Sequence, residues 1–140
     1  MIYLLGKYLH PNFEPFSFLR LVEYISARAI GAALTAIILT LGERHPKTPL
    51  VPAATSPERP RFLRWLIYMA ASPYMTFVQF NHPERYLEDE KTHAGLVENA
   101  RQRLIGQFAV LDRAISGSPF FLESGVSALD FYLYMLVEFL

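Results

Sequence analysis

The sequence contains no cysteine. Disulfide bonds, thiolate catalysis and cysteine-based metal sites are therefore excluded. It also lacks an excess of charge of either sign, because 13 Lys and Arg residues balance 13 Asp and Glu residues. Nucleic-acid-binding domains gather basic side chains on one face, so the balanced charges predict no nucleic-acid partner.

The composition is that of a folded globular chain. Hydrophobic residues make up 52% of the 140 residues and charged residues 19%, which argues against disorder and predicts one ordinary domain with a core. Most of the ten prolines fall between apolar blocks and mark the boundaries of helices. The blocks divide the chain into an apolar N-terminal segment, 1–42, a linker, 43–55, and a helical domain, 56–140.

The stretch Ser127–Leu140 is the centre of this prediction. It is uncharged from 131 to 137, and a helix that is apolar on every side belongs in the middle of a domain or in a membrane. Ser127 and Asp130 are spaced as a capping box, in which each side chain accepts a hydrogen bond from the backbone N–H of the other residue. We therefore expect a buried central helix that starts at Ser127.

Two further helices precede it. Apolar residues recur at three- and four-residue spacing over 56–81 and again over 91–116, where the stripe ends at Ile115. Pro73 removes one backbone hydrogen bond and predicts a kink near Met69. The polar stretch 83–90 predicts a surface turn. Arg59, Arg61 and Arg64 are expected on a solvated face. The fold class predicted is all-α.

The N-terminal segment leaves two interpretations open. It lacks the basic n-region of a cleavable secretory signal. The uncharged run 29–42 is shorter than the roughly twenty residues that a membrane span needs, which favours a buried helix. Extending the run back to 21 reaches that length but includes Glu23 and Arg28. A single membrane helix over 21–41 is therefore the alternative.

Residues 1–41 carry a first resemblance. Their Y-L-H-P opening, the F-x-F-L-R segment and the stretch S-A-R-A-I-G-A-A-L-T-A resemble the start of phospho-N-acetylmuramoyl-pentapeptide transferase. This resemblance implies a membrane helix and no active site, because nothing after Gly42 matches the catalytic aspartates or the histidine cluster of that family.

A second resemblance covers Ala36 to Leu140. The motifs are L-G-E-R-H-P with P-L-V-P, S-P-E-R-x-R-F-L-R-W-L, L-D-R-A-I, and P-F-F-L followed by S-A-L-D-F-Y-L-Y-M-L. In this order they resemble the C-terminal helical domain of the cytosolic glutathione transferase superfamily. The resemblance implies a helical bundle around a buried, capped central helix. It also implies a homodimer through the helices 56–81 and 91–116, and a cytoplasmic location.

The departures from that family concern its chemistry. Its thioredoxin-like domain, which holds glutathione and activates the thiol, has no counterpart here. Ala33 and Leu34 stand where the resemblance expects the Glu-Ser pair that grips the γ-glutamyl group. We therefore predict no glutathione cofactor and no catalytic residue. By the same resemblance, Tyr68, Ser72 and Met75 are candidates for the wall of a substrate pocket.

No metal site is predicted from the histidines. His10, His45, His82 and His93 are far apart in the sequence and share no ligand spacing, so loop or surface roles are expected.

Three functional hypotheses follow. The first is an interaction or dimerisation module, or an inactive transferase fragment, of the glutathione transferase type. The second is a membrane-anchored protein that uses the helix 21–41. The third is a transferase whose missing domain is supplied by a partner chain.

Overall fold

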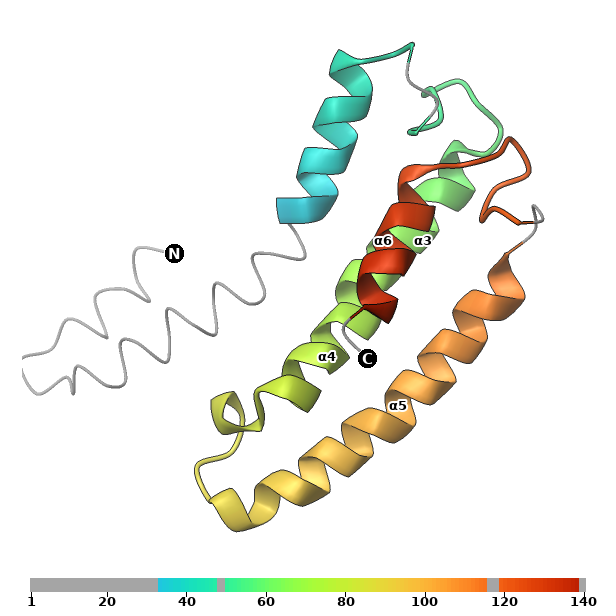
Figure 1. Ribbon diagram of the computed structural model, residues 1–140. Coiled ribbons are helices and arrows are strands. Elements are labelled where there is room, and N and C mark those ends of the chain that lie inside the picture. Colours follow the sequence, from blue (N-terminus) through green and yellow to red (C-terminus); the bar gives the residue numbers. More distant parts are fainter. Residues whose placement is uncertain (1–32, 48–49, 116–118, 139–140) are drawn as a thin grey trace, which may run out of the picture.

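A computed structural model describes residues 33–47, 50–115 and 119–138, which form helices joined by loops (Figure 1). The elements are a helical segment over 33–44, α3 (Arg59–Ala71), α4 (Pro73–Asn81), the short 3₁₀ helices η1 (Pro83–Arg85) and η2 (Glu90–Thr92), α5 (His93–Ala114) and α6 (Ala128–Val137). The described residues contain no strand, only an isolated bridge between Leu122 and Gly125. The all-α prediction is confirmed for this part of the chain.

The helices α3 and α4 follow one another along nearly one line, and α5 returns beside them (Figure 1). The packing of α4 against α5 is the most extensive between two elements, and α6 packs against α3. The turn formed by η1 and η2 joins α4 to α5 at the end far from α6. The start of α6, the linker and the segment 33–44 therefore meet at the opposite end of the molecule.

The long helix predicted over 56–81 is divided at Ser72. Pro73 has no N–H to donate, so the regular hydrogen bonding of α3 stops there and α4 begins. The backbone N–H of Ser72 still donates to the Tyr68 carbonyl at 2.9 Å, which keeps the two helices nearly in line. The interruption lies three residues beyond Met69, where a kink was expected.

Both predicted helices cover fewer residues than the sequence suggested. In the first, regular helix begins at Arg59 instead of residue 56, and the Ser56 side chain accepts from the Glu58 N–H at 3.3 Å in the preceding turn. The second, α5, stops at Ala114 because Ile115 takes an extended conformation. Ile115 is exposed there, so its predicted place in the buried stripe is wrong. Residue 116 lies outside the described residues.

The core lies among α3, α4, α5 and α6. It is formed by large apolar side chains from these four helices and from the loop before α6: Phe62, Leu66, Met69, Phe77, Leu104, Leu111, Phe121, Leu122, Leu129, Tyr132 and Leu136. Trp65 joins its edge and meets the rings of Tyr68 and Phe121 edge-on, with centroids 5.5 and 5.8 Å apart. Such edge-to-face contacts stabilise by about 0.5–1.5 kcal/mol beyond burial.

The prediction that the helix starting at Ser127 is enclosed on all sides is wrong for the described residues. Leu129, Tyr132 and Leu136 are buried on one side of α6, whereas Phe131, Tyr134 and Val137 are exposed on the other. The reason is that α6 has its main helix contact, with α3, along the buried side. Its uniform apolar character therefore does not correspond to uniform burial.

The possible membrane span over 21–41 falls mostly in residues 1–32, which lie outside the described residues, as does most of the first resemblance. Among the helices that are described, none is long and apolar enough to cross a membrane.

Candidate functional site

The start of α6 is fixed by the predicted capping box, both halves of which are present. The Asp130 carboxylate accepts from the Ser127 N–H at 2.7 Å and from the Ser127 hydroxyl at 3.0 Å. The Ser127 hydroxyl oxygen in turn accepts from the Leu129 N–H at 3.3 Å. Ser127 is buried, so these groups have little access to water and depend on one another.

Two further hydrogen bonds attach this helix start to distant segments. The other carboxylate oxygen of Asp130 accepts from the Phe121 N–H at 2.8 Å, and the Ala128 N–H donates to the Leu50 carbonyl at 2.8 Å. The first bond holds the loop before α6, and the second holds the linker. The first turn of α6 is therefore a fixed platform on which the linker lies.

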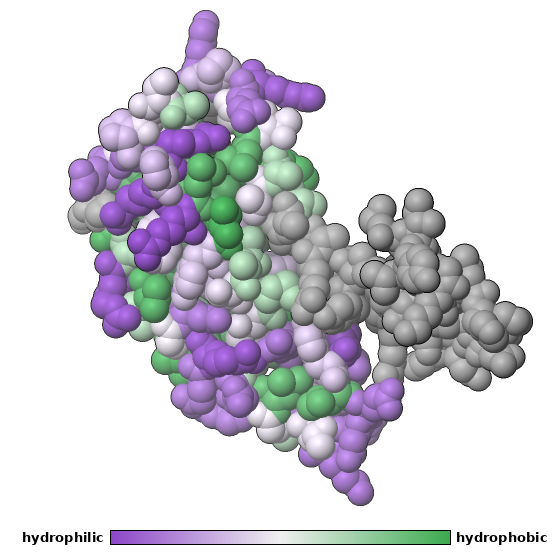
Figure 2. Space-filling view, turned by 180° about the vertical axis from the view of Figure 1, so that it is seen from behind, coloured by the Kyte–Doolittle hydropathy of each residue, from purple (hydrophilic) through white to green (hydrophobic). Residues whose placement is uncertain are grey.

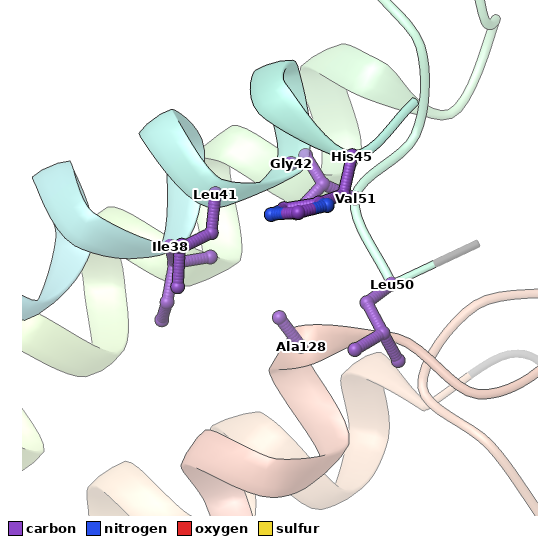
Figure 3. A pocket seen from close by; sticks show the side chains of 7 residues that line it. All are labelled: Ile38, Leu41, Gly42, His45, Leu50, Val51 and Ala128. Atoms are coloured by element: carbon purple, nitrogen blue, oxygen red, sulfur yellow. The ribbon is translucent and has the colours of Figure 1, made fainter. Parts of the chain in front are cut away.

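An apolar pocket of about 270 Å³ lies against this platform (Figure 3). Its walls come from three separate parts of the chain: Ile38, Leu41, Gly42, His45, Leu50, Val51 and Ala128. Figure 3 shows the Ala128 methyl pointing toward the segment that carries Ile38 and Leu41, with the His45 ring between Leu41 and Val51. His45 is the one side chain of the wall that can form hydrogen bonds.

Gly42 lets the helical segment 33–44 come this close to the linker. A Cβ atom at position 42 would lie 2.5 Å from Val51 Cβ, far inside van der Waals contact. The backbone N–H of His45 donates to the Leu41 carbonyl at 2.9 Å, which continues the helical turn as far as the pocket. Sequence reasoning missed this pocket, because its wall is assembled from three separate segments and no local pattern marks it.

The three residues predicted to line a substrate pocket do not contribute to this one. Tyr68 packs edge-on against Trp65, and the Ser72 carbonyl accepts from the Thr76 hydroxyl at 3.0 Å at the α3–α4 junction. Met75 is half-buried on α4. The assignment of Tyr68, Ser72 and Met75 to a pocket wall stays a prediction from the resemblance.

The remaining histidines have local contacts. His82 Nδ1 lies 3.1 Å from a Glu84 carboxylate oxygen, and His93 Nε2 lies 2.9 Å from the Leu87 carbonyl oxygen. The described residues include no group of three His, Asp or Glu side chains that could hold a metal ion. His10 lies outside them.

The arginines of α3 are less solvated than predicted. Arg59 donates to the Pro52 carbonyl at 2.8 Å, and Arg61 donates to the Ala114 carbonyl at the end of α5. The Arg64 guanidinium lies 5.0 Å from the centre of the Trp65 ring. The prediction of a freely solvated face is therefore wrong for Arg59 and Arg61, because free carbonyls at the linker and at the α5 C-terminus bind their guanidinium groups.

Tyr132 is the buried ionisable group of α6. Burial raises the pKa of its hydroxyl to about 12, with a smaller contribution from Tyr74. Burial also raises the pKa of Tyr74, which is half-buried. Neither hydroxyl can therefore serve as a base near neutral pH.

The outer side of α6 is the second notable feature. Phe131, Tyr134 and Val137 are 59%, 66% and 47% exposed and follow one another at three-residue spacing. Elsewhere, the helical segment 33–44 exposes Ile37 and Leu41, whereas α3 exposes Ile67 and α5 exposes Ile105, each as the single large exposed apolar residue of its helix. In the rear view, apolar residues lie scattered among polar ones over the described surface (Figure 2).

Neither a protein-family model, nor a curated protein, nor a solved structure matches this chain.

Proposed function

We propose that this chain is a helical interaction module of the glutathione transferase C-terminal type, which pairs with a second copy and holds no glutathione. The order of its elements supports the proposal. A helix broken at Ser72 is followed by a long antiparallel helix, an apolar loop and a capped helix, as the sequence resemblance implies. On the same resemblance we propose a cytoplasmic location for the module.

The residues at the two positions that bind glutathione in the family support the proposal that this chain holds none. Ala33 is exposed and ends in a methyl group, and Leu34 packs against the core. Neither side chain can bind a carboxylate or an ammonium group, which the Glu-Ser pair of the family does. Conjugation would also require a group that stabilises the glutathione thiolate.

The observation that carries the proposal is the exposed side of α6. Three large apolar side chains on one short helix form a compact patch, and aromatic residues are enriched at protein interfaces. Burying a fully exposed apolar side chain of this size stabilises by about 1.5–3 kcal/mol, and each of these three, being about half exposed, would contribute about half of that. A covered α6 would thus be enclosed on both sides, which is the environment that its sequence predicts.

A second copy is the occupant that fits this patch. In a two-fold pair, the same three side chains contribute twice, so a small patch yields a self-complementary interface. The formal net charge of zero means that long-range repulsion does not oppose the pairing. This proposal moves the interface from the helices 56–81 and 91–116 to α6, because Ile67 and Ile105 are single exposed apolar residues on α3 and α5.

The test is the mass of the full chain by size-exclusion chromatography with light scattering, with and without detergent. We expect a dimer without detergent, and a monomer for the double variant Phe131→Lys/Tyr134→Lys. The matched control Ile67→Lys/Ile105→Lys should remain a dimer. A monomeric wild-type chain, or a control that dissociates while the α6 variant does not, would overturn the α6 interface. A chain that stays dispersed only in detergent would support the membrane hypothesis instead.

The proposal that the chain does not bind glutathione is tested separately. Titration with reduced glutathione should give no binding heat, and the chain should pass through immobilised glutathione without retention. Retention that free glutathione reverses would contradict this part of the proposal, whatever the oligomeric state.

A further inference from the structure

We propose that the apolar pocket of Figure 3 binds a small monocarboxylate whose body is one substituted aromatic ring or a short alkyl chain. The pocket lies between the segment 33–44, the linker and the first turn of α6. It shares no residue with the exposed side of α6, so this inference does not depend on the proposed pairing.

The size of the pocket sets the size of the ligand. An apolar protein cavity of about 150 Å³ holds one benzene molecule. The volume here, about 270 Å³, accommodates a ring with one or two substituents. Dedicated pockets for larger, drug-sized ligands usually begin at about 300 Å³. The pocket therefore selects a small body.

The chemistry of the wall sets the ligand's polarity. Ile38, Leu41, Leu50, Val51 and Ala128 supply only hydrocarbon, which favours an apolar body. His45 contributes its ring at one side and is the one lining side chain that can form hydrogen bonds. A single hydrogen-bonding group beside a hydrocarbon wall favours a ligand with one polar end, and a carboxylate oxygen can accept from the imidazole N–H.

The pocket is held open by contacts that do not involve a ligand. The hydrogen bond from Ala128 to Leu50 fixes the distance between α6 and the linker, at 2.8 Å from nitrogen to oxygen. The close approach at Gly42 fixes the helical segment against Val51. A preformed wall lowers the ordering cost of binding, so even a small ligand can bind measurably.

The probe is 4-ethylbenzoate, titrated into the ¹⁵N-labelled full chain and followed by NMR. We expect saturable shifts of the Gly42, Leu50 and Ala128 amides, with a dissociation constant on the order of 1 mM for a ligand of this size. Acetate, which lacks the apolar body, should leave these amides unchanged. Ethylbenzene, which lacks the carboxylate, should shift the same amides.

Three variants locate the site. Ala128→Leu fills the pocket and should weaken the binding of 4-ethylbenzoate at least fivefold. Leu41→Trp, which enters from the exposed side of the helix, should have the same effect. His45→Ala should weaken 4-ethylbenzoate about threefold or more and leave ethylbenzene unchanged. The control Ala109→Leu on the exposed face of α5 should bind as the wild type does.

The proposal is overturned if the largest shifts lie away from these amides, or if both pocket-filling variants bind as the wild type does. Equal loss of 4-ethylbenzoate and ethylbenzene in His45→Ala would also overturn the role of His45 as the partner of the carboxylate.

Discussion

The carboxylate of Asp130 accepts a hydrogen bond from the backbone N–H of Phe121 at 2.8 Å, across nine residues of sequence. Its second oxygen accepts from the Ser127 N–H at 2.7 Å. One side chain therefore starts α6 and also holds the loop that places Phe121 and Leu122 in the core. Asp130 is thus a structural residue whose two oxygens have different partners.

Replacing Asp130 by alanine should lower the free energy of unfolding by about 3 kcal/mol. The variant leaves the N–H groups of Ser127 and Phe121 without an acceptor, and hydrogen bonds to a charged group contribute about 1.5–3 kcal/mol each. The measurement is urea denaturation followed by the fluorescence of Trp65, the single tryptophan, which is buried in the core.

Two variants calibrate this value. Ser127→Ala removes only the serine half of the cap and should cost about 1 kcal/mol. Asp112→Ala, on the exposed side of α5, should change stability by less than about 0.5 kcal/mol. If Asp130→Ala costs no more than Asp112→Ala, the carboxylate does not hold the loop as described.

Gly42 and Gly106 should respond in opposite ways to alanine. At Gly42 the added methyl would lie 2.5 to 2.9 Å from three atoms of Val51, so the helical segment must shift, at a cost of about 1–3 kcal/mol. At Gly106, in the middle of α5, nothing lies within 4 Å of the added atom, and alanine should stabilise by about 0.5–1 kcal/mol.

Combining Gly42→Ala with Val51→Gly tests the cause. The second change removes all three Val51 atoms that the new Cβ meets, so it should restore much of the stability lost by Gly42→Ala, as a coupling in a double-mutant cycle. Urea denaturation of the four proteins supplies the data. If the stability changes of the two single variants simply add up in the double variant, the cost of Gly42→Ala does not come from contact with Val51.

The local signals in the sequence predicted the local structure well. The spacing of Ser127 and Asp130 predicted the capping box, and Pro73 predicted an interruption, because a cap and a missing N–H act within one helical turn. The position of the break was wrong by three residues. The chain keeps the hydrogen bond from Ser72 to Tyr68 and loses regularity only where the proline follows.

Long-range relationships could not be predicted in this way. The contact of Asp130 with Phe121, and those of Arg59 with Pro52 and Arg61 with Ala114, depend on how segments meet in space. The exposed side of α6 was missed for the same reason. An apolar helix shows that burial is favourable, but which of its sides a neighbour covers is decided by the packing of the whole chain.

Glu98 should titrate far below an ordinary glutamate. Hydrogen bonds from Arg101, and then from Gln102, lower its pKa from 4.5 to about 2. Because the folded-state pKa is depressed, the stabilisation is present above pH 4.5 and is lost as the pH falls through about 2. A carboxyl-carbon NMR titration measures the midpoint.

The partner variant Arg101→Gln should move the Glu98 midpoint up toward 4.5, because it removes the guanidinium whose hydrogen bonds are the main cause of the depressed pKa. The Glu98–Arg101 pair is exposed, so screening by 1 M salt should also move the Glu98 midpoint of the wild type up toward 4.5. An unchanged midpoint in Arg101→Gln would show that the hydrogen bonds at 2.8 and 2.9 Å do not persist in solution.

Tyr132→Phe should leave stability unchanged or raise it by up to about 1 kcal/mol at neutral pH. The Tyr132 hydroxyl is buried and has no hydrogen-bond partner among the described residues, and removing an unsatisfied buried polar group relieves its desolvation cost. Leu136→Ala, four residues along the buried side of α6, should instead cost about 2–5 kcal/mol because it opens a cavity. Urea denaturation compares the two variants with the wild type.

At high pH, the wild type and Tyr132→Phe should differ in how stability depends on pH. Burial raises the folded-state pKa of Tyr132 from 10 to about 12, so below pH 10 the hydroxyl is neutral in both states and its stability contribution does not change with pH. As the pH rises from about 10 through 12, the unfolded chain ionises first, and the folded state loses stability relative to it. The wild type should therefore lose stability more steeply over this range than Tyr132→Phe. Equal slopes for the two proteins would show that the hydroxyl is solvated in the folded state, and a large loss of stability in Tyr132→Phe at neutral pH would show that it has a partner.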